Sequence, residues 1–252
     1  MISRIESTQN QRVKQWKKLQ TKKERNKTGL FLIEGMHLVE EALKYKAYVK
    51  ELIVRDGTEY SLLDVGNIDV FEVTEEVMKH ISETETPQGI AAVCGMTGPT
   101  PINIATAKLL LIDNVQDPGN LGTMIRTADA VGMDAVILGE GCVDLYNGKV
   151  IRATQGSLFH IPILEGSLDV WIKRLAVIGV PIYGTALERA RNYKEVEPQK
   201  HFALLVGNEG SGVDPKLLKQ TDENLYIPIY GKAESLNVSI ATGILLYHLR
   251  GV

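Results

Sequence analysis

The amino-acid sequence predicts an α/β protein built on a parallel sheet, for two reasons. Short apolar runs alternate with helical patterns through the second half of the chain, which is typical of buried strands covered on both faces by helices. Three of these runs end in glycine, asparagine, aspartate or serine where the next helix should begin. With 252 residues, 44% of them hydrophobic, the chain can bury one large core or two smaller ones.

The first 95 residues predict a basic helix followed by a small α/β unit. The helix is expected over residues 11–25, with Val13, Trp16 and Leu19 on its apolar face. The elements after it are expected as strand 30–33, a helix through 38–43, strands 52–54 and 70–73, helix 74–81 and strand 90–93. Residues 96–107 are polar and contain two prolines, so they predict a linker.

From residue 108 the alternation becomes regular. We expect strands at 109–112, 135–138, 180–183, 202–206 and 225–229, and helices at 120–131, 171–177 and 236–249. The predicted parts of the chain are a basic extension (1–29), a small α/β domain (30–95), the linker (96–107) and a large parallel-sheet domain (108–252).

Charge is distributed unevenly along the chain, whose net charge is −3. Residues 1–30 carry nine Lys and Arg against two Glu, whereas the other 222 residues carry 19 basic and 29 acidic side chains. A basic segment on an acidic protein is typical of phosphate binding. The candidate RNA-binding residues are Arg12, Lys14, Lys17, Lys18, Lys22, Lys23 and Arg25. The alternative is a solvated amphipathic helix with no ligand.

Composition argues against three other classes of protein. No apolar run is long enough to span a membrane, and the first 14 residues lack the apolar core of a secretory signal. The two cysteines, Cys94 and Cys142, have no metal-type spacing, and the five histidines are scattered. We therefore expect no disulfide framework and no metal site, and we expect the protein in the cytoplasm.

The three runs that break into small polar residues lie at 112–122, 205–212 and 227–239. In an open α/β sheet the carboxyl ends of strands bind ligands, so these segments predict one shared crevice. Glycine lets the backbone turn tightly or approach a ligand closely, although a single glycine also serves as a plain turn. Neither a Walker loop nor a G-x-G-x-x-G fingerprint is present. Ser235 or Asn237, taken alone, could simply cap the last helix.

Together, the segments resemble the motifs of a known family. Residues 113–122 followed by Arg126, residues 207–212, and residues 227–229 with 235–241 resemble, in order, the three motifs of the SpoU/TrmH RNA ribose 2′-O-methyltransferases. The N-terminal part, including residues 34–43 and 86–90, is similar to that family's substrate-binding domain of ribosomal-protein-L30e type.

The resemblance implies a SPOUT domain with a deep trefoil knot, a homodimer with the site near its interface, and S-adenosylmethionine as cofactor. By motif position, the residues implied to bind the cofactor are Thr185, Ala186, Leu205, Gly207, Ile227, Ile229 and Leu236.

The resemblance also implies that catalysis rests on Arg126, with Asn120, Glu209, Ser235 and Asn237 around it. A free arginine has a pKa above about 12 and is a poor base. We therefore interpret Arg126 as an electrostatic stabiliser of the developing ribose alkoxide and a clamp on the adjacent phosphate. The alternatives are that Arg126 accepts the proton itself, or that it is an ordinary helix arginine, paired for example with Glu209.

The expected function is S-adenosylmethionine-dependent methylation of a ribose 2′-hydroxyl in structured RNA. Ribosomal RNA is favoured because the chain has a separate N-terminal substrate domain. Three alternatives stay open: a tRNA 2′-O-methyltransferase, a catalytically silent RNA-binding protein of the same fold, and a base-methylating enzyme of the wider knotted superfamily.

Overall fold

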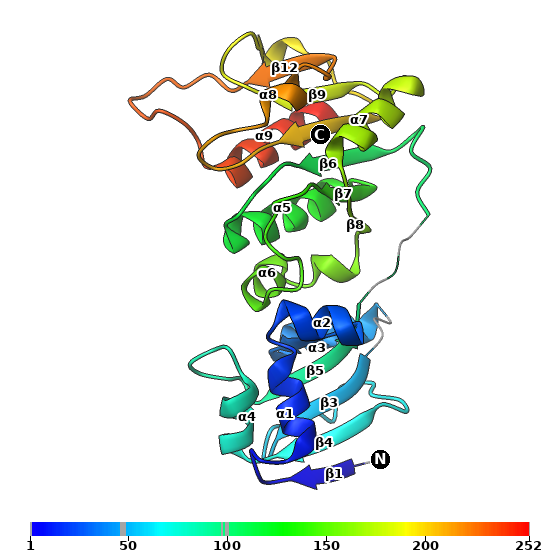
Figure 1. Cartoon of the computed structure of the whole chain (residues 1–252), viewed down its shortest axis with the longest axis vertical. Coiled ribbons are helices and arrows are strands. Elements are labelled where there is room, and N and C mark those ends of the chain that lie inside the picture. The colour runs from blue at the N-terminus through cyan, green and yellow to red at the C-terminus, as the bar shows by residue number, and fades with distance from the viewer. Residues whose placement is uncertain (1, 46–48, 97, 99–100, 252) are drawn as a thin grey trace. The chain divides into compact units, whose positions relative to one another are not determined.

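The structure, a computed structural model, describes residues 2–45, 49–96, 98 and 101–251. The chain folds as two compact units (Figure 1). Unit 1 consists of Met1–Gly98 and Asp144–Phe159, and unit 2 of Pro99–Val143 and His160–Val252. Residues 97, 99 and 100 of the expected linker lie outside the described residues.

Unit 1 contains a five-stranded sheet in the order β1–β4–β3–β5–β2. Its strands are β1 (Ile2–Ile5), β2 (Leu30–Glu34), β3 (Val49–Arg55), β4 (Asp69–Val73) and β5 (Ile90–Gly95). Its helices are α1 (Gln11–Lys18), α2 (Lys22–Thr28), α3 (Met36–Lys44), α4 (Glu75–Ile81), α6 (Gly148–Thr154) and the 3₁₀ turn η1 (Ser157–Phe159). β1, β4 and β3 pair in parallel, whereas β5 pairs antiparallel with both β3 and β2.

The expected basic helix is in fact two helices. The first ends at Lys18, and Thr21 then caps α2 by accepting a hydrogen bond from the Glu24 N–H at 3.4 Å. Gly29 closes α2 in the left-handed conformation, with φ of 67°. Trp16 of α1 is 2% exposed and packs edge-on against Phe71, with ring centroids 5.5 Å apart. The basic segment is therefore part of the core of unit 1 rather than an appended arm.

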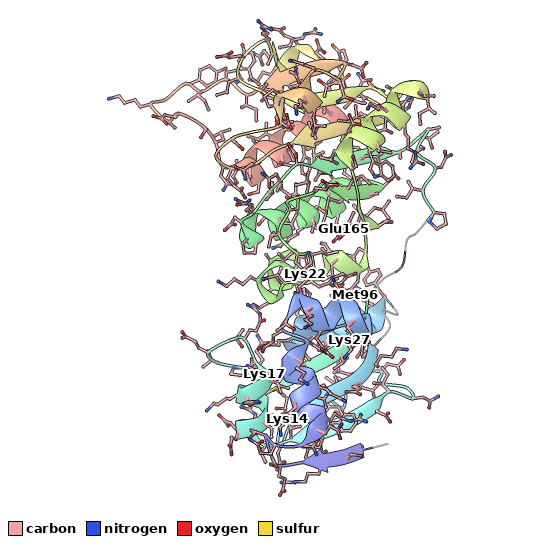
Figure 2. The ribbon with its side chains drawn as sticks, viewed as in Figure 1. Lys14, Lys17, Lys22, Lys27, Met96 and Glu165 are labelled. Carbon is pink, nitrogen blue, oxygen red and sulfur yellow. The ribbon has the colours of Figure 1, made fainter. Side chains whose placement is uncertain are left out.

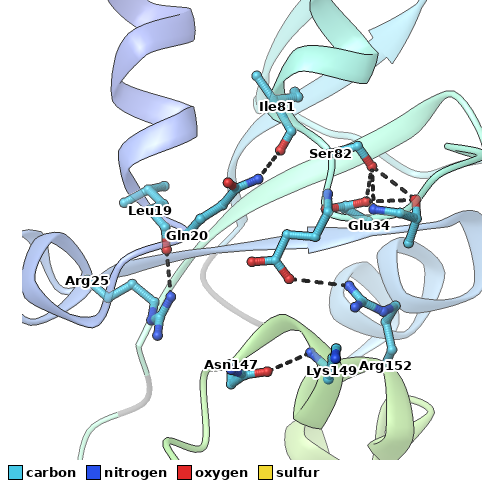
Figure 3. Close-up of polar contacts among 11 residues, drawn as sticks. Leu19, Gln20, Arg25, Glu34, Ile81, Ser82, Asn147, Lys149 and Arg152 are labelled. Atoms are coloured by element: carbon cyan, nitrogen blue, oxygen red, sulfur yellow. Dashed lines mark hydrogen bonds and ion pairs between the residues drawn. The ribbon is translucent and has the colours of Figure 1, made fainter.

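Residues 144–159 pack with unit 1, although the sequence analysis assigned them to the second domain. Arg25 is 4% exposed, and its guanidinium pairs with Asp144. The guanidinium also donates to the Leu19 carbonyl oxygen at 2.8 Å (Figure 3). The rings of Phe31 and Tyr146 lie 4.6 Å apart. These contacts join segments far apart in sequence, so no local pattern predicts them.

Unit 2 contains a seven-stranded, wholly parallel sheet in the order β10–β12–β9–β11–β6–β7–β8. Its strands are β6 (Lys108–Ile112), β7 (Ala135–Leu138), β8 (Ile163–Glu165), β9 (Ile182–Thr185), β10 (Arg191–Asn192), β11 (Phe202–Val206) and β12 (Glu223–Tyr226). Its helices are α5 (Pro118–Val131), α7 (Leu168–Val177), α8 (Pro215–Leu218), α9 (Val238–Arg250) and the 3₁₀ turn η2 (Tyr193–Glu195).

The parallel sheet confirms the expected α/β fold class. Strands β6 and β11 lie at its centre and read Leu-Leu-Leu-Ile and Ala-Leu-Leu-Val, buried on both faces, as expected for a sheet covered by helices. The short elements β1, α6, β8, β10 and α8 were not predicted, because so few residues carry little periodicity. No helix of the described chain combines the length and apolar character needed to cross a membrane.

Candidate active site and RNA-binding residues

The candidate active site begins where the two central strands of unit 2 end. Ile112 of β6 lies opposite Val206 of β11, so the chain leaves both strands at the same edge of the sheet. The Asp113 N–H donates to the Val206 carbonyl oxygen at 2.8 Å, which ties the first predicted segment to the second. Because β6 lies between β7 and β11, this edge is a topological switch point, where α/β sheets bind ligands.

The loop after β11 folds back on its own first residue, and Gly207 makes this possible. A Cβ atom at position 207 would lie 2.2 Å from the Val213 nitrogen and 2.3 Å from the Gly212 carbonyl carbon. Asn208 and Gly212 exchange two backbone hydrogen bonds of 3.0 Å. Gly212 has a φ of 71°, which favours glycine. Gly207 is therefore required by close backbone packing, and Gly212 is favoured by its positive φ.

This loop borders an open crevice of about 470 Å³ at the carboxyl ends of β9, β11 and β12. Six of the residues predicted to bind the cofactor line it: Thr185, Ala186, Gly207, Ile227, Ile229 and Leu236. Two of the residues predicted to be catalytic, Glu209 and Ser235, line it as well. The second and third predicted segments thus meet around one cavity of a size typical of small-molecule sites, whereas no residue of 112–122 lines it. The roles of the lining residues stay predictions.

Leu205 does not belong to this lining. Its side chain is fully buried in the apolar core of unit 2, because β11 is covered on both of its faces. Only its carbonyl oxygen is near the crevice, where it accepts a hydrogen bond from Thr185 Oγ1 at 3.3 Å. The Leu205 side chain therefore does not line the crevice, and a cofactor contact of Leu205 stays a prediction for its backbone alone.

Three of the predicted catalytic residues form one hydrogen-bonded chain. Asn120 Nδ2 donates to Glu209 Oε1 at 3.2 Å, and Asn237 Nδ2 donates to Asn120 Oδ1 at 2.9 Å. Asn237 Oδ1 in turn accepts from the Ser239 N–H at 2.9 Å and from Ser239 Oγ at 2.5 Å. Asn237 caps α9 and also belongs to this hydrogen-bonded chain, while its role in catalysis stays a prediction.

Glu209 determines which atoms donate and which accept in this series of hydrogen bonds. Partial burial would raise the pKa of the Glu209 carboxyl, but hydrogen bonds from its own N–H, from Asn120 and from the Asp117 and Gln116 N–H groups lower it. An ionised Glu209 accepts hydrogen bonds only, so it holds the NH₂ group of Asn120 toward itself. The Asn120 oxygen must then face Asn237, and one N–H of each amide is left for a ligand.

Arg126 is not part of this chain. It lies in α5, six residues after Asn120, and its side chain is exposed. In the part of the chain that the structure describes, it has no hydrogen bond or ion pair, with Glu209 or any other residue. Its guanidinium is therefore available to a substrate, and the alternative of a pair with Glu209 is not supported.

The sequence analysis missed two residues that orient the site, Asp117 and Ser239. Asp117 Oδ1 accepts from the Asn120 N–H at 2.7 Å and caps α5, whose first residue is Pro118. An Asp-Pro pair ahead of a helical pattern is a recognised start signal, so this cap was predictable. Ser239 is 7% exposed, and no sequence pattern showed that its hydroxyl would bind Asn237.

The predicted RNA-binding residues divide into two groups. Lys14, Lys18, Lys22 and Lys23 are exposed and Lys17 is half-buried, and Figure 2 shows Lys14, Lys17 and Lys22 spread along α1 and α2. Arg25 is buried and paired with Asp144, so its prediction as an RNA contact is wrong. Arg12 pairs with Glu51 at 2.9 Å and stacks over Phe71, so its guanidinium already has partners in unit 1.

Comparison with known families identifies the class of protein that this fold and crevice define. Residues 107–247 match the SpoU rRNA Methylase family, and residues 10–92 match the MRM3-like substrate binding domain. The chain belongs to the SpoU rRNA methylase family. The family prediction, and with it the class of enzyme, an RNA 2′-O-ribose methyltransferase that uses S-adenosylmethionine, is therefore confirmed.

Individual relatives are similar over almost the whole chain. The 23S rRNA (guanosine(2553)-2′-O)-methyltransferase RlmP of Bacillus subtilis is 57% identical, over 99% of this chain and 100% of its own length. The AdoMet-bound rRNA methyltransferase of Sinorhizobium meliloti superposes with a TM-score of 0.88 at 32% identity, covering 99% of this chain and 97% of its own. The AdoMet complex of AviRb from Streptomyces viridochromogenes gives 0.85 at 27% identity, covering 96% and 97%.

Proposed function

We propose that this protein methylates the ribose 2′-hydroxyl of a guanosine in 23S ribosomal RNA. The observation that supports this most directly is the 57% identity, end to end, to an enzyme named for that reaction. Ribosomal RNA is the substrate that the sequence already favoured. The choice of guanosine is added from the name of this relative. Action on tRNA and a silent RNA-binding role are the alternatives to this proposal.

The crevice fits S-adenosylmethionine by its chemistry. Ile227, Leu236 and Leu245 give it apolar walls, and the loop around Gly207 places backbone against its border with no room for a side chain. An adenosine moiety needs apolar packing on its ring and hydrogen bonds to its edge, which such a crevice provides. When bound, the cofactor supplies an electrophilic methyl group on a sulfonium sulfur.

The predicted catalytic residues would hold the ribose and stabilise the charge that develops on its 2′-oxygen. The free N–H groups of Asn120 and Asn237 are suited to hold a ribose edge in one orientation. The exposed guanidinium of Arg126 would stabilise the negative charge that develops on the 2′-oxygen as its proton leaves, and would bind the adjacent phosphate. Ser235, at the border of the crevice, would take part in holding the ribose.

We also propose a knotted fold, a homodimer and a cytoplasmic location for this protein. Family membership supports a trefoil knot in unit 2, an L30e-type fold for the N-terminal domain and a homodimer. A second copy has a suitable surface on α9, where Ile240 and Tyr247, seven residues apart on one face, are 55% and 45% exposed. A ribosomal RNA substrate and two free cysteines fit the cytoplasm. The described residues contain no group of three or more His, Cys, Asp or Glu side chains that could hold a metal ion.

Mapping of ribose methylation tests the function. A 2′-O-methyl group protects the adjacent phosphodiester from alkali, so every methylated position in total RNA can be read from cells with and without the gene. We expect one guanosine of the large-subunit RNA to lose its methyl group and to regain it with the wild-type gene. Loss of a tRNA site would instead establish the tRNA alternative, and an unchanged map would exclude methyl transfer.

We expect the exposed lysines to affect RNA affinity without affecting stability, and the buried Arg25 to affect stability without affecting RNA affinity. Joint replacement of Lys14, Lys18, Lys22 and Lys23 by glutamine should flatten the dependence of log RNA affinity on log salt by about 3 units, because each single-strand phosphate contact contributes about 0.7. The melting temperature should stay near that of the wild type. The measurement is filter binding of ribosomal RNA at several salt concentrations.

The matched variant is Arg25→Met. Removing one partner of a buried ion pair typically costs about 3–5 kcal/mol of unfolding free energy, so this variant should melt at a much lower temperature. Where it is folded, its salt dependence should equal that of the wild type. If the dependence of RNA affinity on salt is unchanged in the lysine variant, the exposed lysines of α1 and α2 form a solvated surface that does not bind RNA.

A further inference from the structure

Large apolar side chains are left in water at the border of the crevice. Leu187 is 73% exposed, Tyr230 is 87% exposed and Leu236 is 38% exposed. Single exposed apolar residues are common on proteins, but these three come from the two loops that follow β9 and β12 and bound one site. A group of apolar side chains beside a polar catalytic network indicates a surface that a ligand covers.

Tyr230 differs from the other two because it does not line the crevice. Leu187 and Leu236 do so, as does Ile229, the residue directly before Tyr230. The Tyr230 ring has no ring contact, hydrogen bond or ion pair among the residues that the structure describes. Tyr230 is thus next in sequence to a residue that lines the crevice, without lining the crevice itself.

The loop that carries Tyr230 has room to receive a ligand. Residues 230–237 are all exposed, and Figure 1 shows the connection between β12 and α9 extending away from the sheet. The loop returns to the site at Ser235 and Asn237, which places Tyr230 on the same segment as two predicted catalytic residues. Lys232, two residues after Tyr230, is exposed as well and adds a positive charge to the same loop.

We propose that the Tyr230 ring stacks on an unpaired base of the RNA substrate, at or beside the nucleotide whose ribose is methylated, while Lys232 contacts a phosphate of the same strand. This rests on the proposed function. Proteins read RNA sequence chiefly at unstacked bases, which they hold on aromatic side chains. We assign the ribose to Asn120 and Asn237 and the base to a separate group, for which Tyr230 is an exposed aromatic side chain on the loop that also carries Asn237.

Steady-state kinetics with three variants tests the proposal, using large-subunit ribosomal RNA from cells that lack the gene. Tyr230→Ala should raise the KM for RNA by about 5- to 150-fold, the value of one stacked base. Its kcat at saturating RNA should stay within about threefold of the wild type, and S-adenosylmethionine should bind with unchanged affinity in calorimetry.

Two further replacements separate stacking from apolar contact. Tyr230→Phe keeps the ring and should keep the wild-type KM, whereas Tyr230→Leu keeps apolar surface without a π face and should behave like Tyr230→Ala. Leu62→Ala is the matched control, because Leu62 is 94% exposed and lies in unit 1. Its KM should equal that of the wild type.

Each contrary result has its own meaning. A parallel loss of S-adenosylmethionine affinity in Tyr230→Ala would make Tyr230 part of the cofactor site and overturn the proposal. A changed mass in sedimentation would assign the ring to contact with a second copy, and unchanged kinetics would leave it a plain surface residue. If the wild-type protein transfers no methyl group, the proposed function fails. Filter binding of the same RNA to wild type and Tyr230→Ala then still tests the stacking.

Discussion

Arg126→Ala is expected to lower methyl transfer by at least about a hundredfold, the scale for removing one preorganised electrostatic group from an active site. Arg126 is exposed on α5, six residues after Asn120, and has no partner in the described structure that would hold it for a structural purpose. Its charge is therefore free to act on the ribose oxygen and its phosphate. Because Arg126 does not line the crevice, S-adenosylmethionine should bind the variant nearly as well as the wild type.

Two variants make this result specific. Arg126→Lys should recover little activity, because a compact ammonium cannot reproduce the planar, two-pronged contact of a guanidinium with a phosphate. Arg250→Ala removes another exposed arginine of unit 2, at the end of α9, and should leave turnover unchanged. Single-turnover methylation of ribosomal RNA at saturating cofactor gives the rate. Near wild-type turnover in Arg126→Ala would show an ordinary helix arginine.

The sequence predicted those parts of the site that depend on local pattern. The apolar runs of β6 and β11 were expected to be strands because four and five consecutive apolar residues, ended by Asp113 and Gly207, leave few alternatives. Their ends fall together because parallel strands pair in register, so Asp113 and Gly207 could be expected at one edge. The resemblance to the family motifs, and not residue type alone, singled out Asn120, Glu209 and Asn237, whose side chains the structure joins by hydrogen bonds.

The remaining features depend on contacts between distant residues. Arg25 is attached to Asp144, 119 positions away, so its charge looked available in the sequence and is buried in the fold. Strand β1 has four residues and forms only because β4 offers an edge to pair with. The bond between Asn237 and Asn120 spans 117 positions. The periodicity of apolar residues shows which face of a helix or strand is buried. It does not show which distant part of the chain packs against that face.

Gly207→Ala is expected to abolish S-adenosylmethionine binding. The new methyl group would lie 2.2 Å from the Val213 nitrogen, 2.3 Å from the Gly212 carbonyl carbon and 2.4 Å from its oxygen. All three are backbone atoms and cannot rotate away as a side chain can. The loop closed by the Asn208–Gly212 hydrogen bonds would have to open, and it forms one border of the crevice.

Thermal melting with and without cofactor measures this effect. A ligand at a hundredfold excess over its dissociation constant stabilises the folded protein by about 2.7 kcal/mol, and this gain should vanish in Gly207→Ala. Gly210→Ala is the matched control, since it makes the same change in the same loop, where the nearest atom to the new Cβ is Asn208 Oδ1 at 3.6 Å. That variant should keep the full cofactor-dependent rise in melting temperature. If Gly207→Ala kept it too, the crevice beside this loop would not be the cofactor site, and the strand ends of β6, β7 and β8 would have to be searched for it instead.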